Sequence, residues 1–118
     1  MVSLIVGVAQ VTLLVRYARS LKDKRNALKG VTQKLRNAGF SVTECAYADS
    51  AKQASLGFAC VGTSATAVQQ TLDDGLRYFT GDYEVLASNT DVFDYSEVET
   101  IDFDAAEEND PRQGYGDE

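Results

Sequence analysis

The first stretch of the chain alternates apolar and polar positions with the two-residue period of a half-buried β-strand. Residues 3–16 are predicted to form that strand, and one of its faces would carry Ile5, Ala9, Val11, Leu13 and Val15. Gln10 and Thr12 interrupt the apolar run on the other face. The run is too short to cross a bilayer, and no charged leader precedes it, so a cytoplasmic protein without membrane attachment is expected.

The period then changes to that of an amphipathic helix over residues 21–37. One side of this helix carries Leu21, Leu28, Val31 and Leu35. Ser20, followed three residues later by Asp23, is a variant of the capping box, and Gly39 follows as a C-terminal signal. This helix is therefore predicted to pack its leucine side on the sheet.

Residues 40–48 and 54–62 have strand composition and are joined by the short connection 49–53, which indicates a hairpin. A turn centred near residues 52 and 53 would place Cys45 opposite Cys60. A cross-strand disulfide is conceivable, but two small residues that face each other in a reducing cytoplasm is the favoured interpretation.

A second amphipathic helix is predicted within residues 63–81, capped by Thr63 or Ser64 and ended by Gly81. Its buried side would carry Val68, Leu72, Leu76 and Phe79. The last strand is predicted from residues 83–86 and 92–103, bent or bulged around the sequence ASNTD at 87–91.

The element order is βαββαβ, which is typical of an α+β ferredoxin-like fold with a four-stranded antiparallel sheet and two helices on one face. Residues 1–103 would form this domain, and residues 104–118 an acidic tail that is disordered unless bound. The uncovered sheet face would be too apolar for open water, since it would carry Leu4, Val6, Val8 and Leu14. Either the bent last segment or a second copy would cover it, and a homodimer is favoured.

Charge is divided along the chain, although the formal net charge is −7. Residues 1–43 hold eight Lys or Arg against one acid, and residues 44–118 hold three against seventeen. On a helical wheel, Lys22, Arg25, Lys29 and Arg36 fall within about 60° of one another. Lys24 falls among the leucines instead, where its stem would cover apolar surface while its ammonium extends to water.

The basic stripe has two interpretations. It could contact the phosphates of RNA, or it could be a solvated helix face balanced by the protein's own acids. The first interpretation is carried by the one-sided charge, and its predicted RNA-binding residues are Arg16, Arg19, Lys22, Lys24, Arg25, Lys29 and Arg36. Free backbone N–H groups at the start of this helix could also hold a small anion, which Asp23 would oppose.

The composition argues against catalysis and bound cofactors. Histidine, the commonest general base and metal ligand, is absent, and two cysteines cannot complete a structural zinc site. The acids at 91, 94, 97, 99, 102 and 104 lack the spacing of a calcium loop and indicate a solvated edge strand. Gly57 would mark a bulge or a close backbone approach. A non-enzymatic protein without catalytic, metal or cofactor-binding residues is therefore expected.

The sequences ARSLKDKR at 18–25 and QASLGFACV at 53–61 resemble the YlxP-like family of small bacterial proteins, and the resemblance extends from residue 3 to about residue 103. It implies the same ferredoxin-like fold and a link to ribosome maturation or translation, with no catalytic residues. The chain departs from the family at 49–54, where DSAKQA stands in place of a sequence similar to DLWQRA; only Asp49 and Ala54 match. The resulting hypothesis is a ribosome- or RNA-associated factor, with a homodimeric ligand-sensing or protein-interaction module on the open sheet face as the alternative.

Overall fold

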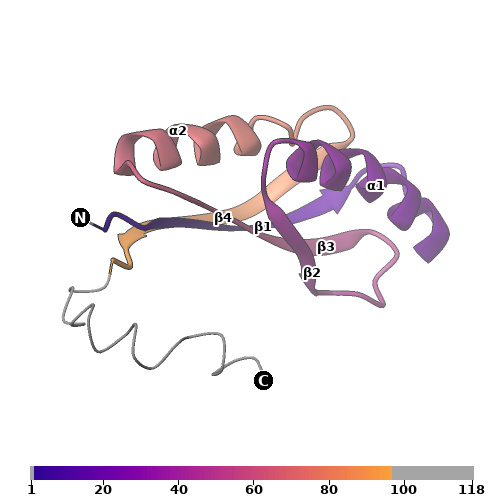
Figure 1. Cartoon of the computed structure of the whole chain (residues 1–118). Coiled ribbons are helices and arrows are strands. Elements are labelled where there is room, and N and C mark those ends of the chain that lie inside the picture. The colour runs from indigo at the N-terminus through magenta and orange to yellow at the C-terminus, as the bar shows by residue number, and fades with distance from the viewer. Residues whose placement is uncertain (1, 97–118) are drawn as a thin grey trace, which may run out of the picture.

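The computed structural model describes residues 2–96, which form one sheet with two helices packed on the same side of it (Figure 1). In chain order the elements are β1 Ile5–Val15, α1 Leu21–Asn37, β2 Ser41–Ala46, β3 Gln53–Gly62, α2 Ala65–Leu76 and β4 Tyr83–Asp94. The strands lie in the order β2-β3-β1-β4, and every pair is antiparallel. The predicted α+β ferredoxin-like fold is confirmed. The predicted domain end at residue 103 and the tail 104–118 lie outside the described residues.

The core lies between the sheet and the helices, as the two periodicities predict. Alternate residues of β1 are buried from Ile5 to Val15, and Val11 and Leu13 have no exposed surface. Burying a side chain of this size stabilises the fold by about 1.5–3 kcal/mol. The helices bury Leu28, Val31 and Leu35 from α1 and Val68 and Leu72 from α2 against this face.

Both helices begin at the predicted residues. The Ser20 hydroxyl accepts a hydrogen bond from the Asp23 N–H at 3.0 Å, which is the first half of the predicted capping box, whereas Asp23 Oδ2 accepts from the N–H of Arg19, the residue before the cap, at 3.0 Å. Ser64 caps α2 by accepting from the Ala67 N–H at 3.3 Å. However, α2 ends at Leu76 and not near residue 81, because the next residues form a turn that still buries Phe79.

The irregularity in the last strand is closer to its start than predicted. Residues 87–91 continue β4 as regular strand and pair with β1. Instead the register shifts between the pairs Leu13–Val85 and Thr12–Ala87, which leaves Leu86 as the extra residue of a bulge. The predicted bulge around 87–91 is therefore wrong in its position.

The two cysteines do not face each other, because the hairpin register differs from the predicted one. Ser41 pairs with Ala59 and Glu44 with Leu56, which centres the turn near residue 50. Cys45 is the extra residue of a second bulge and its thiol donates to the Ser55 carbonyl at 3.4 Å, while Cys60 pairs with Gly7 of β1. Both thiols are free.

The tight glycine contacts in this sheet are at Gly7 and Gly62, both against Val68, and not at Gly57. Gly57 is paired regularly on both sides, and a Cβ there would meet only ordinary contacts of 3.8 Å or more, so the predicted bulge or close approach is wrong. A Cβ on Gly7 would lie 2.6 Å from Val68 Cγ1 of α2. The absence of a side chain at Gly7 is what lets α2 approach β1.

Neither helix is long and apolar enough to span a membrane, in the part of the chain that the structure describes.

Candidate nucleic-acid interface

Four cations lie along one flank of α1, and we call this set the basic ridge: Lys22, Arg25, Lys29 and Arg36. All four side chains are exposed. Among residues 2–96, no carboxylate lies within ion-pair distance of any of them. The nearby acid of the same helix, Asp23, has its carboxylate bound to the Arg19 N–H. The ridge therefore presents positive charge that the described part of the protein does not neutralise locally.

The ridge lies on the β2 side of the molecule. Arg36 Nη2 approaches the Val42 carbonyl of β2 at 3.5 Å, which places this flank above the edge of the sheet. Arg16 and Arg19, the other predicted contacts, are exposed in the connection before α1. Arg16 Nη1 lies 3.9 Å from Glu84 Oε1, with both side chains about half exposed, so this pair is weak.

Lys24 is not part of the exposed surface, and its predicted extension to water is wrong. Its side chain is 1% exposed, and its Nζ donates to Glu44 Oε2 at 3.0 Å. The same ammonium donates to three backbone carbonyls: Tyr47 at 2.8 Å, Gln53 at 3.1 Å and Ala48 at 3.4 Å. A charged group is buried here because the end of the β2–β3 hairpin supplies its full set of acceptors.

The hairpin turn that Lys24 holds also contacts the connection before α1. The Val15 N–H donates to the Lys52 carbonyl at 2.8 Å, and Lys52 Nζ donates to the Arg16 carbonyl at 3.4 Å. Tyr47, at the start of the turn, has a φ of 65°, and its side chain is half exposed. Lys52 and Tyr47 were not among the residues predicted from the sequence. The sequence could have indicated them only through Lys24. A lysine on the buried side of the helix requires a carboxylate partner from another element, and that element carries the turn with Tyr47 and Lys52.

The sheet face opposite the helices is open and carries apolar side chains at one end. Val6 lies between Val61 of β3 and Phe93 of β4, whose side chains are 67% and 41% exposed. In the next row the Tyr95 N–H donates to the Leu4 carbonyl at 2.8 Å, and both side chains are exposed. The described part of the last segment lies beside β1 and does not cover this face.

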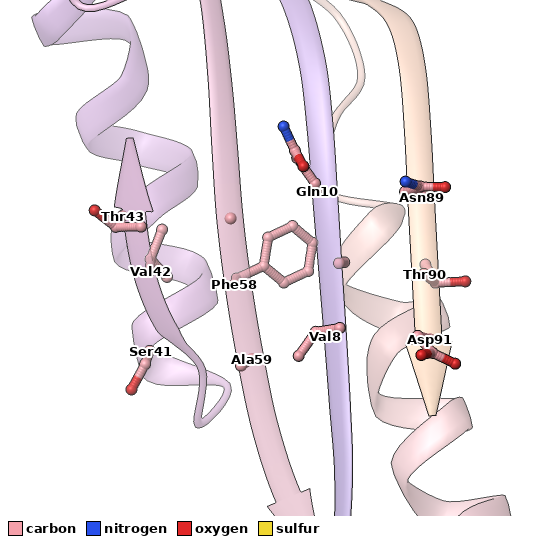
Figure 2. A pocket seen from close by; sticks show the side chains of 12 residues that line it. Val8, Gln10, Ser41, Val42, Thr43, Phe58, Ala59, Asn89, Thr90 and Asp91 are labelled. Atoms are coloured by element: carbon pink, nitrogen blue, oxygen red, sulfur yellow. The ribbon is translucent and has the colours of Figure 1, made fainter. Parts of the chain in front are cut away.

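The middle of the same face is a hollow of about 690 Å³ that spans all four strands, with an apolar floor that includes Val8 and Ala59 and polar side chains along its sides. Figure 2 shows Ser41 and Thr43 of β2 on one side of it and Asn89 and Asp91 of β4 on the other. Gly57 lies among its lining residues and contributes no side chain. One row further along β3 on the same face, the buried Ser55 hydroxyl accepts from Gln10 Nε2 at 3.0 Å and lies 3.1 Å from Thr12 Oγ1. The hollow offers amide and hydroxyl groups, with one carboxylate, for hydrogen bonds to a bound molecule.

The groups with shifted pKa values lie outside both the ridge and the hollow. Burial raises the pKa of the Cys60 thiol, and burial together with the Asp82 carboxylate raises the pKa of Tyr83. Hydrogen bonds from the Ser96 side chain and backbone lower the pKa of Asp94. No group of three or more metal-ligating side chains occurs within residues 2–96. Asp91 and Asp94 are exposed on the edge strand β4, and the remaining acids of that predicted solvated edge lie outside the described residues.

No curated protein matches the chain. The model of a family described as a protein of unknown function, DUF503, matches residues 6–92, which span β1 to the greater part of β4. The chain therefore belongs to the DUF503 family.

Proposed function

We propose that this protein is a non-enzymatic, cytoplasmic factor that binds structured RNA, such as ribosomal RNA, through the basic ridge of α1. The observation that carries the proposal is the set of four exposed cations on one flank of the helix, without an ion-pair partner among residues 2–96. Lys and Arg side chains on such a surface bind phosphates and release the counterions that surround RNA. The resemblance to the YlxP-like family, with its link to ribosome maturation, supports the same choice of partner.

The open sheet face is a weaker candidate for RNA. In RNA-recognition modules with a four-stranded sheet, aromatic side chains on the central strands stack on bases. The central rows here carry Gln10 and Thr12 of β1 opposite Gly57 and Ser55 of β3. The ridge would therefore contact backbone phosphates and contribute little sequence specificity.

The test is co-sedimentation of the full chain with 30S and 50S ribosomal subunits across a salt series. The ridge variant is Arg25→Glu/Lys29→Glu, and the matched control is Lys34→Glu/Arg77→Glu. Both variants change the net charge equally, and all four positions are exposed. Because Glu and Lys have similar helix propensities, neither variant is expected to unfold the domain.

Four phosphate contacts predict that the logarithm of the association constant falls with the logarithm of the salt concentration at a slope of about −3. The ridge variant should reduce both binding and slope, whereas the control should bind as the wild type does. Equal loss in the two variants would show that only net charge matters. An absence of association at low salt would refute the proposal.

A second candidate is favoured by the apolar rows at Leu4, Val6, Val61, Phe93 and Tyr95: this face would pack on a second copy of the chain. Four strands spaced about 4.8 Å apart and a β3 of 10 residues give the face about 650 Å². A stable interface buries about 800 Å² per partner, so the face is close to the required size. Sedimentation equilibrium of the wild type and of Val61→Asp tests this: a dimer that the substitution dissociates supports it, and a monomeric wild type refutes it.

A further inference from the structure

Two tyrosines are exposed at the end of the sheet where α1 begins. Tyr17, in the connection between β1 and α1, is 75% exposed, and Tyr47, at the start of the β2–β3 turn, is 49% exposed. Aromatic rings usually bury most of their large apolar surface in the core or in an interface. The remaining described tyrosines on the helix side, Tyr78 and Tyr83, follow that rule and are partly buried against the core. The exposure of Tyr17 and Tyr47 therefore requires a separate explanation.

The backbone holds Tyr47 in a conformation that bulky residues rarely adopt. Its φ of 65° lies in the left-handed region, which glycine and asparagine favour. The Tyr47 carbonyl accepts from Lys24 Nζ at 2.8 Å and from the Ser50 N–H at 3.0 Å, and these bonds stabilise the conformation. Backbone strain of this kind persists where the surroundings enforce it, and it occurs often at binding sites. The buried Lys24 thus fixes the backbone at a residue whose aromatic side chain is half exposed.

Cations lie close to Tyr17 along the chain and are joined to the Tyr47 turn by loop contacts. Arg16 and Arg19 flank Tyr17, and Lys52 joins the Tyr47 turn to Arg16 by its hydrogen bond to that residue's carbonyl. The acids at this end are Asp23, whose carboxylate accepts from the Arg19 N–H, Glu44, bound to Lys24, Glu84, beside Arg16, and the exposed Asp49 and Asp82. Lys22, the first residue of the basic ridge, lies in the first turn of α1, next to these loops, so the ridge begins where this set of tyrosines and cations ends.

We propose that this end of the domain binds unpaired RNA, with Tyr17 and Tyr47 stacking on bases while Arg16, Arg19 and Lys52 contact phosphates. The inference rests on the proposed function and specifies its substrate: an unpaired segment next to the structured RNA that the ridge contacts. In a duplex each base is stacked between its neighbours, so only unpaired bases present a free face to an aromatic ring. Stacking of this kind is tolerant of sequence, whereas the cations track the backbone.

The test measures fluorescence anisotropy of a labelled RNA of about ten nucleotides, a length suited to a single small domain, as a single strand and as a blunt duplex. The full chain is compared with Tyr17→Leu/Tyr47→Leu and with the rescue variant Tyr17→Phe/Tyr47→Phe. Tyr95→Leu is the matched control, because Tyr95 is equally exposed but lies at the far end of β4, on the open face. The chain has no tryptophan and six tyrosines, so the part of the tyrosine quenching that the leucine variant loses reports stacking at Tyr17 and Tyr47.

The leucine variant should lose about tenfold or more in affinity for the single strand, with its salt slope unchanged, because stacking involves no counterions. The phenylalanine and Tyr95→Leu variants should stay close to the wild type, and the duplex should bind more weakly than the single strand. Equal binding of duplex and single strand, or wild-type affinity in the leucine variant, would overturn the inference. If the ridge variant still loses binding in that case, the proposed function stands; if the wild type binds no RNA at low salt, both fall.

Discussion

The buried Lys24 ammonium gives the sharpest prediction from this structure, through the substitution Lys24→Met. Methionine keeps the apolar stem and its approximate length but removes the charge and all the hydrogen bonds to Glu44 and the hairpin carbonyls. The substitution therefore tests the hydrogen bonds between Lys24 and the β2–β3 hairpin, which we call the Lys24 clamp, separately from the packing of the side-chain stem in the core.

The expected loss of stability depends on the polar groups that the substitution leaves without a charged partner. Removing one partner of a buried ion pair destabilises a protein by about 3–5 kcal/mol. The Glu44 side chain is 28% exposed and water can reach it, which lowers the estimate, whereas the carbonyls of Tyr47 and Gln53 lose a charged donor. We expect Lys24→Met to lower the free energy of unfolding by about 3 kcal/mol, which corresponds to a fall in Tm of about 12–24 °C for a domain of this size. Glu44→Gln should cost about 1 kcal/mol, since it keeps part of the hydrogen bonding.

Urea unfolding followed by circular dichroism measures these differences. Lys22→Met is the matched control, because it makes the same chemical change two residues earlier at an exposed position and should stay within about 0.5 kcal/mol of the wild type. Lys24→Arg should also destabilise the domain, because a planar guanidinium cannot direct its donors at the same four acceptors. A cost for Lys24→Met no larger than that of Lys22→Met would refute the clamp.

Four further predictions come from separate parts of the structure. Gly7→Ala should destabilise the domain by about 1–3 kcal/mol in urea unfolding, because its Cβ would lie 2.6 Å from Val68 Cγ1, whereas Gly30→Ala, with open space around it, should stabilise α1 by about 0.5–1 kcal/mol. The raised pKa of Tyr83 favours the neutral phenol in the folded state, so its stabilisation is complete below the pKa of the unfolded chain and is lost as the pH rises through the folded pKa; Tyr83→Phe should flatten the fall in stability above about pH 10. Iodoacetamide should label the exposed Cys45 before Cys60, whose thiol is partly buried and has a raised pKa, as mass spectrometry of the two peptides would show. Deleting residues 104–118, which carry six acids and one Arg, should strengthen RNA binding if the acidic tail competes for the ridge, and unchanged affinity would contradict that role.

The fold was predictable because buried residues recur along the sequence with the period of the strand or helix that they belong to. The alternation along β1 and the leucine stripe of α1 each record which side meets the core, and the caps at Ser20 and Ser64 mark where the helices begin. These signals are local, so no knowledge of neighbouring strands is needed to interpret them.

The bulges were not predictable for the opposite reason. The extra residues, Cys45 and Leu86, are set by how two strands align over their whole length, and that alignment depends on packing between elements. Composition shows that a strand is present, but a single inserted residue changes every pair beyond it. The predicted opposition of Cys45 and Cys60 failed because it assumed one turn position, whereas the true centre lies near residue 50.

The candidate site shows the same division between local and distant causes. The exposure of Lys22, Arg25, Lys29 and Arg36 follows from the helical wheel alone. The position of Lys24 on the wheel was equally clear, but its partners come from residues that are 20 to 29 positions away, so the ammonium was wrongly expected at the surface.

The hexapeptide SLKDKR at 20–25, which carries the resemblance to the YlxP-like family, gains a physical explanation from these contacts. Ser20 caps the helix, Asp23 binds the N–H of the residue before the cap, Leu21 is half-buried, and Lys24 binds the hairpin turn, so four of its six residues serve folding. Ser20 and Asp23 are exposed but engaged at the start of the helix, which leaves Lys22 and Arg25 as the exposed side chains free to contact a partner. A match to this sequence therefore indicates the contact between α1 and the β2–β3 hairpin. By itself it gives little evidence for RNA binding. It follows that variants at Arg25, Lys29 and Arg36 test function, whereas variants at Ser20, Asp23 and Lys24 test stability. A loss of RNA binding in the stability group has to be corrected for the unfolded fraction before the loss is assigned to a missing surface contact.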